Sequence, residues 1–502
     1  MNTRRSFYNA FFGILSQIIT ISMGIIIPRL VIVNLGSESN GLLSSVNQLL
    51  IYLNLLEAGI GTATLQALYK PVAEKNHNVI NGIISATNAY YKKVAKFYTI
   101  ILVIVSFLFP FFVDSELPIS TIIVVVLLSG SSQILNFVFQ AKYRILMEAE
   151  GKNYILINLS TIVNVCISFS KIILLINGFG IISLQILYLV FNIIQVIFII
   201  TYIKRKYKWI NLTVKPNFDA ISQRNSVLIH QISGLVFQNT DVLLLTFFCG
   251  FKTVSVYSMY VMLFGFVSTL INTLNGSVSF VMGQTYHTDK QKFMKIYNAF
   301  ETYNMSLTFS LYTIAGIFIL PFLTIYTRGI SDVAYVDELL PLLFIMTYLL
   351  SNGRSAAQRV IEYAGHFKLT QNRSIIESII NLTISIICVS QFGIYGVLIG
   401  TVCALLYRTI DMIFYSSKKL LNRSPKRTII KWLINFILFV VITIISRKIM
   451  MYITLSNYIK IFVYAFVFSA IIIPVYMLIN SVYDFKSFTY CKNFVMKKLF
   501  KS

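Results

Sequence analysis

Residues 180–208 read GIISLQILYLVFNIIQVIFIITYIKRKYK. The first 24 of these residues carry no charged side chain, and an α-helix of that length can cross a hydrocarbon core about 30 Å thick. Four basic residues follow within the next five positions. Short membrane-flanking segments rich in Lys and Arg stay in the cytosol. The stretch therefore predicts a transmembrane helix whose carboxyl end is cytosolic.

Similar apolar runs recur along the whole chain of 502 residues, which is 57% hydrophobic and 12% charged, with a mean hydropathy of +0.76. An ordinary soluble domain carries about 25% charged residues, so a soluble protein is excluded. We predict an all-α integral membrane protein with about fourteen transmembrane helices. The expected spans cover residues 7–33, 38–68, 84–113, 118–147, 153–177, 180–203, 221–249, 253–284, 296–327, 335–364, 370–391, 393–416, 429–450 and 457–481.

The net charge of +24 is explained by membrane topology rather than by nucleic-acid binding. With the first residue inside, roughly 35 of the 42 Lys and Arg fall on the cytosolic side, which is the positive-inside bias. Both termini are then cytosolic. The five cysteines are scattered singly, so neither a disulfide framework nor a zinc site is expected, and no metal or cofactor is predicted.

Two parts of the first half recur about 214 residues later. RLVIVNLGSESNGLLSSVNQLL (29–50) matches DVLLLTFFCGFKTVSVYSMYVMLF (241–264), with Gly36 falling on Gly250. A second match pairs Arg144 with Arg359. Six spans separate the equivalents, so the halves have the same orientation, and transporters with such parallel repeats bind substrate between the halves. We expect a six-helix bundle at 1–208, a second at 209–421, and helices 13 and 14 with a basic cytosolic tail at 422–502.

The stretches IIIPRLVIVNLGSESNGLLSSVNQLL (25–50), LLEAGIGTATLQALYKPVAEK (55–75) and QNTDVLLL (238–245) followed by SVYSMY (255–260) resemble the Wzx-type polysaccharide flippases. That family belongs to the superfamily of the MATE multidrug exporters and the peptidoglycan lipid II flippases. The resemblance implies two six-helix bundles that alternate around a cavity for an undecaprenyl pyrophosphate-linked oligosaccharide. It also implies a bacterial plasma membrane, a role in surface polysaccharide biosynthesis, and glycosyltransferases or a polymerase as partners.

Arg29 is a candidate contact for the phosphate or sugar of such a substrate. It follows Pro28, which predicts a bend in the first span because its ring clashes with the carbonyl of Gly24. A charged residue in hydrocarbon faces a cavity or a partner, and guanidinium binds phosphate in a bidentate manner. A snorkelling or ion-paired structural arginine is the alternative. Lys171 is a second cationic candidate, although it lies close enough to the end of its span to snorkel.

Polar side chains form stripes on spans 1 and 2 and on their repeat equivalents, spans 7 and 8, and these stripes would line a hydrophilic cavity suited to sugar hydroxyls. Hydrogen bonds that merely join helices are the alternative, worth about 0.6 kcal/mol each. Glu57, Asp241 and His230 are candidates for ion coupling, with H⁺ or Na⁺ left open. The other predicted cavity residues are Asn47, Asn54, Gln238, Asn272 and Asn275.

Arg144 and Arg359 lie at the expected cytosolic ends of spans 4 and 10 and are predicted to form an intracellular gate or to contact headgroups. Ordinary topogenic charge is the alternative explanation.

Other functional classes fit the sequence less well. No HExxH, GxSxG or CxxC pattern occurs, and the longest outer segment, near 327–338, is short, so a membrane polymerase or glycosyltransferase is disfavoured. The chain has no GxxxxGK[ST] loop and is not expected to hydrolyse ATP. A MATE-like ion-coupled drug exporter remains the main alternative. An exporter of cations would favour acidic residues in the cavity, whereas the predicted arginines favour an anionic pyrophosphate.

Overall fold

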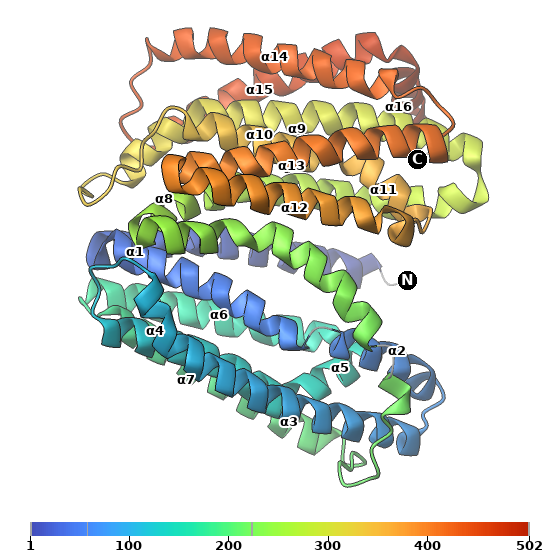
Figure 1. Ribbon diagram of the computed structural model, residues 1–502. Helices are drawn as coiled ribbons and strands as arrows, with labels where there is room; N and C mark the ends of the chain where they lie inside the picture. Colours follow the sequence, from blue (N-terminus) through green and yellow to red (C-terminus); the bar gives the residue numbers. More distant parts are fainter. Residues whose placement is uncertain (1–2, 58, 222–223, 500–502) are drawn as a thin grey trace. The chain divides into compact units, whose positions relative to one another are not determined.

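The computed structural model is all-helical and describes residues 3–57, 59–221 and 224–499 (Figure 1). Within these ranges, side chains at 3–21, 224–239, 277, 280, 494, 495 and 497–499 are outside the description. No β-strand occurs in the described ranges. The predicted all-α membrane fold is confirmed, and the chain is a multi-pass membrane protein.

The α-helices follow one another with short connections. Their bounds are α1 Thr3–Leu53, α2 Ile60–Ala73, α3 His77–Leu108, α4 Ile119–Leu135, α5 Ala141–Ala149, α6 Asn153–Ile176, α7 Ile181–Lys206, α8 Arg224–Thr288, α9 Lys290–Tyr326, α10 Leu340–Gly353, α11 Ser355–Tyr363, α12 Phe367–Phe392, α13 Ile394–Tyr415, α14 Lys426–Met450, α15 Tyr458–Tyr483 and α16 Phe485–Leu499. Short 3₁₀ segments lie at η1 Asn54–Glu57, η2 Phe109–Phe112 and η4 Asp219–Ile221, and π-helical segments at η3 Asn136–Gln140 and η5 Ser416–Leu420.

Ten segments of the described chain are long and apolar enough to cross a membrane. They span 77–112, 119–149, 153–176, 181–206, 240–276, 290–326, 367–392, 394–420, 426–450 and 458–483. The expected span at 335–364 is divided into α10 and α11, with Arg354 between them. The expected span at 38–68 is divided by η1. Neither of these two expected spans is therefore among the ten segments.

Each of the two longest helices contains one glycine that departs from helical geometry. Gly36 in α1 has φ 82° and ψ 167°, and Gly250 in α8 has φ 75° and ψ 176°. A positive φ favours glycine because it has no Cβ. These are the same two glycines that the sequence repeat aligns, so the equivalence predicted from sequence extends to the backbone conformation. Helical geometry continues through Pro28, and the break in α1 lies at Gly36 instead.

The chain divides into two compact units, residues 1–258 and 259–502. In the first unit, the buried rings of Tyr91 and Tyr98 on α3 pack against Phe137 of η3. In the second, α12 and α13 pack closely because Gly396 and Gly400 have no side chain. A Cβ on Gly400 would lie 2.2 Å from the Ser385 hydroxyl oxygen. The division into two repeats and an appended helix pair stays a prediction.

Candidate functional site

A cavity of about 340 Å³ in the first unit contains two of the residues predicted from sequence, Glu57 and Arg144. It lies among η1, α2, α3, η3 and α5. Its lining residues are Glu57, Gly61, Thr62, Leu65, Tyr91, Asn136, Ala141, Arg144, Ile145 and Glu148.

Glu57 is held in place at this cavity by two donors. The Tyr91 hydroxyl donates to Oε1 at 3.1 Å, and the Gln133 amide donates to Oε2 at 3.4 Å. Arg144 and Glu148 are exposed. The buried side-chain oxygen of Asn136 has no hydrogen-bond partner in the described part of the chain. The cavity therefore presents fixed hydrogen-bond acceptors together with a guanidinium group, a combination that suits a hydroxylated ligand.

The π-helical segment η3 helps to shape this cavity. Asn136 begins the segment, and α5 with Arg144 follows it directly. A π-helical turn holds one more residue than an α-helical turn, so it alters which side chains face inward, and such turns are frequent at functional sites. Span 4 of the prediction is thus two helices joined by a π-helical turn, which hydrophobic periodicity did not reveal.

Also in the first unit, the part of α1 after Gly36 meets the residues of α8 around Gly250 along a polar contact that we call the seam. Asn40 donates to the Ser255 hydroxyl at 2.8 Å. Ser45 and Thr246 share a hydrogen bond at 2.7 Å. The residues of the seam are Asn40, Gly41, Ser45, Tyr52, Thr240, Thr246, Phe251 and Ser255.

The seam is buried and closely packed at its centre. Ser45, Thr246 and Ser255 are completely buried. Gly41 approaches the backbone of Phe251 so closely that a Cβ would lie 1.9 Å from the Phe251 carbonyl oxygen. The residues that form these hydrogen bonds are not among those predicted for the stripes on spans 2 and 7, so the sequence did not reveal this direct contact.

The other predicted residues of the first unit do not line the polar cavity. Asp241 is buried and accepts a hydrogen bond from the Tyr257 hydroxyl at 2.9 Å. Arg29 is half-buried and Asn47 is exposed. Lys171 places its ammonium nitrogen 5.5 Å from the centre of the Tyr188 ring on α7.

Asn54 is half-buried, and its side-chain oxygen has no hydrogen-bond partner among the described residues. The side chains of His230 and Gln238 lie outside the described residues.

In the second unit, Arg359 of α11 donates to the Ser279 hydroxyl of α8 at 2.5 Å. The Tyr363 hydroxyl donates to the Ser279 carbonyl at 2.8 Å. Arg359 therefore fastens α11 to α8, which the sequence did not reveal. Asn272 is exposed, and its amide donates to the Ser268 hydroxyl at 3.4 Å.

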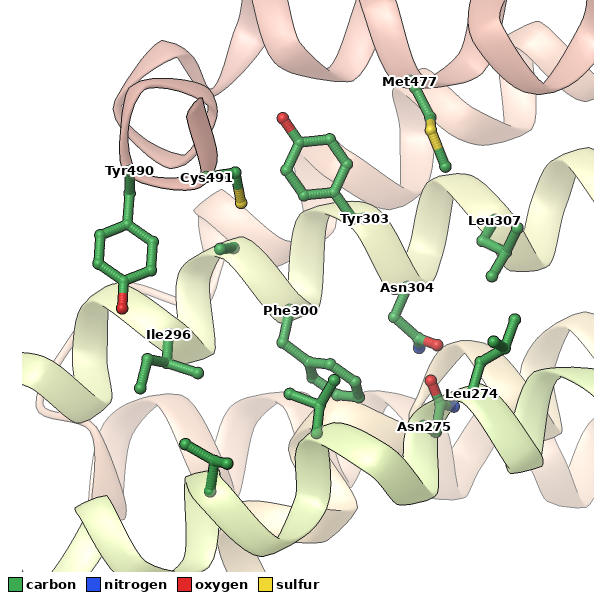
Figure 2. Close-up of a pocket in the computed structure, with 13 residues that line it drawn as sticks. Leu274, Asn275, Ile296, Phe300, Tyr303, Asn304, Leu307, Met477, Tyr490 and Cys491 are labelled. Atoms are coloured by element: carbon green, nitrogen blue, oxygen red, sulfur yellow. The ribbon is translucent and has the colours of Figure 1, made fainter. Parts of the chain in front are cut away.

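Asn275, in contrast, is buried beside a second cavity of about 460 Å³ (Figure 2). The walls come from α8, α9, α15 and α16 and are mostly aliphatic or aromatic. Figure 2 shows Asn275 on α8 and Asn304 on α9 extending toward one another, with Tyr490 and Cys491 entering from α16. The lining residues are Leu274, Asn275, Val278, Val281, Ile296, Ala299, Phe300, Tyr303, Asn304, Leu307, Met477, Tyr490 and Cys491.

A buried ion-pair network, which sequence reasoning missed, joins α9 to α14 and to the start of α16. Lys431 is completely buried, with its ammonium nitrogen 3.0 Å from Glu301 Oε2 and 3.1 Å from Asp484 Oδ2. Arg423 and Arg427 pair with the same two acids. Burial alone would raise the pKa of Asp484, but Lys431 and Arg427 outweigh it and hold the pKa well below its usual range.

A second buried ionic network lies within α10 to α13. Arg354 donates to Glu377 Oε1 at 2.7 Å, and Arg408 donates to Asp411 Oδ2 at 2.8 Å. Arg373 also pairs with Asp411. Among the residues that the structure describes, no group of three or more His, Cys, Asp or Glu side chains could hold a metal ion.

The fold is similar to that of known transporters and flippases. A structure described as lipid II flippase MurJ in an inward closed conformation matches with a TM-score of 0.69 and 16% identity, covering 94% of this chain and 98% of that one. An inward-facing multidrug resistance MATE family transporter of the MOP superfamily matches with a TM-score of 0.64 and 15% identity, covering 79% of this chain and 93% of that one. An outward-facing MATE family transporter matches with a TM-score of 0.52 and 16% identity, covering 78% of this chain and 92% of that one.

No family model matches the sequence, and no curated protein matches it. The chain has the fold of the MATE and lipid II flippase structures, and at this identity the likeness establishes the fold alone.

Proposed function

We propose that this protein is a flippase that moves an undecaprenyl pyrophosphate-linked oligosaccharide from the cytosolic to the outer leaflet of a bacterial plasma membrane, for surface polysaccharide biosynthesis. The observation that carries the proposal is the extent of the likeness. The lipid II flippase structure covers 94% of the chain, whereas the two MATE structures cover 78–79%.

The two cavities give this proposal its chemical basis. The cavity in the second unit is walled by apolar side chains, including those of α15 and α16, and suits the hydrocarbon part of an amphiphilic substrate. The cavity in the first unit carries carboxylate, amide and guanidinium groups, which suit sugar hydroxyls. An apolar site with few polar groups and a separate polar site fit a lipid-linked sugar better than they fit a compact drug cation.

The seam supports alternating access as the mechanism. Its hydrogen bonds are made by short hydroxyl and amide side chains, each worth about 1 kcal/mol, so the contact is able to break and re-form. The seam residues of α1 follow Gly36, and those of α8 lie on both sides of Gly250. Each long helix therefore has a glycine with positive φ beside the seam, where its backbone direction is able to change. In the proposed cycle the seam closes one side of the transport path. Arg29, Arg144, Arg359 and Lys171 remain candidates for contact with the pyrophosphate or sugar, and Pro28 remains a candidate part of the gate.

Energy for the cycle comes from outside this chain's own chemistry, because the sequence has no nucleotide-binding loop. We propose that an ion gradient or consumption of the glycolipid on the outer side drives transport, with Glu57, Asp241 and His230 as the candidate ion-coupling residues. We infer that the chain is not an enzyme, and that glycosyltransferases and a polymerase are its functional partners.

The test uses a deletion strain of the parent organism, complemented with the wild-type chain or with a Ser45→Cys/Thr246→Cys variant whose seam is oxidised shut. Intact cells are treated with an impermeant oxidant, and lipid-linked saccharides are then extracted and assigned to a leaflet by whether they have been oxidised. Complete units should accumulate in the inner leaflet of the deletion strain, and only the wild type should relieve this. Units that reach the outer leaflet unjoined would indicate a polymerase. Unchanged glycolipids with new drug sensitivity would indicate an exporter.

A further inference from the structure

A third cavity, of about 470 Å³, lies in the second unit on the surface between α9 and α14. It is formed near the carboxyl ends of both helices and is separate from the cavities assigned to transport. Its lining residues are Gly316, Ile317, Leu320, Pro321, Thr324, Glu338, Thr443, Arg447, Met450, Met451, Ile453 and Leu455. Its volume is within the usual range of about 300–1,000 Å³ for small-molecule sites.

The floor and rim of this cavity have different chemistry. Ile317, Leu320 and Pro321 give an apolar wall on α9. The rim carries one carboxylate and one guanidinium, from Glu338 and Arg447, and both side chains are exposed. A site with one acid and one base at its rim is complementary to a ligand that carries both charges.

Two polar groups of the lining residues lack an ordinary hydrogen-bond donor or partner. The hydroxyl oxygen of Thr443 is buried and has no hydrogen-bond partner among the residues described, although burial of an unpaired hydroxyl is costly. Pro321 has no N–H to donate to the carbonyl of Ile317, four residues earlier in α9. A hydroxyl and a backbone carbonyl are thus available where an ester or an amine of a ligand would lie.

The surface around the cavity is the kind that faces lipid. Ile444, Ile445 and Ile449 on α14 are each about half exposed, at 53%, 52% and 45%. Beyond the helix, Met451 and Tyr452 are 82% and 91% exposed. An apolar groove in such a surface is accessible to a lipid chain from the side, and Arg447 on its rim lies in the last turn of α14.

The loop that carries Glu338 is firmly held. The Asp337 carboxylate accepts hydrogen bonds from the backbone N–H groups of Leu339 and Leu340 at 2.8 and 2.9 Å, and from the Tyr395 hydroxyl. Burial acts to raise the pKa of Asp337, but the Tyr395 and backbone hydrogen bonds lower it below its usual value. Glu338 is therefore presented from a fixed backbone rather than from a flexible connection.

We propose that this cavity binds a zwitterionic phospholipid with a primary amine, of the phosphatidylethanolamine class. Arg447 binds the phosphate, since guanidinium matches its oxygens. Glu338 and the Ile317 carbonyl accept from the ammonium group. Thr443 donates to an ester carbonyl, and one acyl chain lies along Ile317, Leu320 and Pro321. An anionic phospholipid is excluded by repulsion from Glu338, and a soluble zwitterion leaves the apolar wall uncovered.

The test uses the purified full-length chain in detergent and native mass spectrometry, with phosphatidylethanolamine, phosphatidylcholine and phosphatidylglycerol of identical acyl chains added in turn. The wild type should retain phosphatidylethanolamine best. Arg447→Gln should weaken retention of both zwitterionic lipids about tenfold, as expected for loss of one charge-assisted bond. Glu338→Gln should reduce phosphatidylethanolamine to the level of phosphatidylcholine, because a quaternary ammonium donates no hydrogen bond.

Lys448→Gln is the matched control, because it removes an exposed positive charge from the next residue of α14 without altering the cavity lining. It should bind as the wild type does. Equal retention of phosphatidylglycerol and phosphatidylethanolamine by the wild type would overturn the proposal, as would Glu338→Gln and Arg447→Gln variants that bind like the Lys448→Gln control. The inference is independent of the transported substrate, so it survives or fails separately from the proposed function.

Discussion

The closest approach in the seam allows a sharp prediction for Gly41→Ala. The new Cβ would lie 1.9 Å from the Phe251 carbonyl oxygen and 2.5 Å from its carbonyl carbon. Both are backbone atoms, so no side-chain rotation relieves the clash. To restore an ordinary contact of 3.4 Å, the two segments must separate by 1.5 Å (3.4 − 1.9).

That separation is sufficient to break the seam. Adding 1.5 Å to the Asn40–Ser255 and Ser45–Thr246 bonds of 2.8 and 2.7 Å gives 4.3 and 4.2 Å, beyond hydrogen-bond distance. Two buried hydrogen bonds contribute about 2 kcal/mol. If the chain retains the contact instead, overpacking costs about 1–3 kcal/mol. Either way the closed seam loses roughly 2 kcal/mol, about a thirtyfold change in its population relative to an open state.

Disulfide formation between Ser45→Cys and Thr246→Cys, in a chain whose five native cysteines are replaced, measures this population. Their hydroxyl oxygens lie 2.7 Å apart, so the new sulfur atoms are able to bond. Gly41→Ala should slow cross-linking strongly. Gly276→Ala is the matched control, because Gly276 is a helical glycine with no atom within 4 Å of an added Cβ. Equal cross-linking rates in the two glycine variants would refute the reasoning.

Three further outcomes follow from the buried charges and the polar cavity. Lys431→Met leaves Glu301 and Asp484 buried without their shared ammonium partner. In a denaturant titration it should lower the free energy of unfolding by about 3–5 kcal/mol, and Lys431→Met/Glu301→Gln should recover part of this loss. The pKa of Asp484 is below its ordinary value of 3.8, so its stabilisation is complete above that pH and lost as the pH falls further. The melting temperature should therefore fall more steeply below pH 4 in the wild type than in Asp484→Asn, and parallel curves would contradict this. Arg144→Ala should reduce glycolipid translocation about tenfold at equal expression, whereas Lys92→Ala, outside the cavity lining, should not.

Local sequence patterns were sufficient for the helices and for one part of the site. Uncharged runs and positive-inside bias identify membrane helices because both reflect the cost of moving charge into hydrocarbon. The repeat aligned Gly36 with Gly250, and the structure shows that both adopt a positive φ, although the bend predicted from sequence was placed at Pro28. Glu57 and Arg144 were each noted as charges in or beside a span, and the structure places both on one cavity.

The remaining features of the site depend on contacts between residues far apart in the sequence, which no local pattern reveals. Ser45 and Thr246 are 201 residues apart, and neither is unusual in a transmembrane helix. Lys431 lies near the start of an expected span, where a lysine is ordinarily topogenic, so its burial against Glu301 had no signal in the sequence. The end of the chain was predicted only as a basic cytosolic tail, and the contribution of Tyr490 and Cys491 to a cavity required the fold.

The buried network around Lys431 is best understood as a positioning device for α14 to α16. A buried ion pair is weak evidence for stability, because desolvation offsets most of its attraction. The network does define geometry: the Lys431 ammonium lies 3.0 Å from Glu301 on α9 and 3.1 Å from Asp484, which lies in the turn directly before α16. Trp432, the next residue, packs so closely on Gly353 that a Cβ there would lie 2.6 Å from its ring. Together these contacts fix α14 against α9 and α10. They also place α16 over the apolar cavity of Figure 2, whose wall includes Tyr490 and Cys491. Replacing the network by well-packed apolar residues should therefore preserve the free energy of unfolding but allow α16 to move relative to the cavity. That result would show that these charges position the helices rather than stabilise the fold.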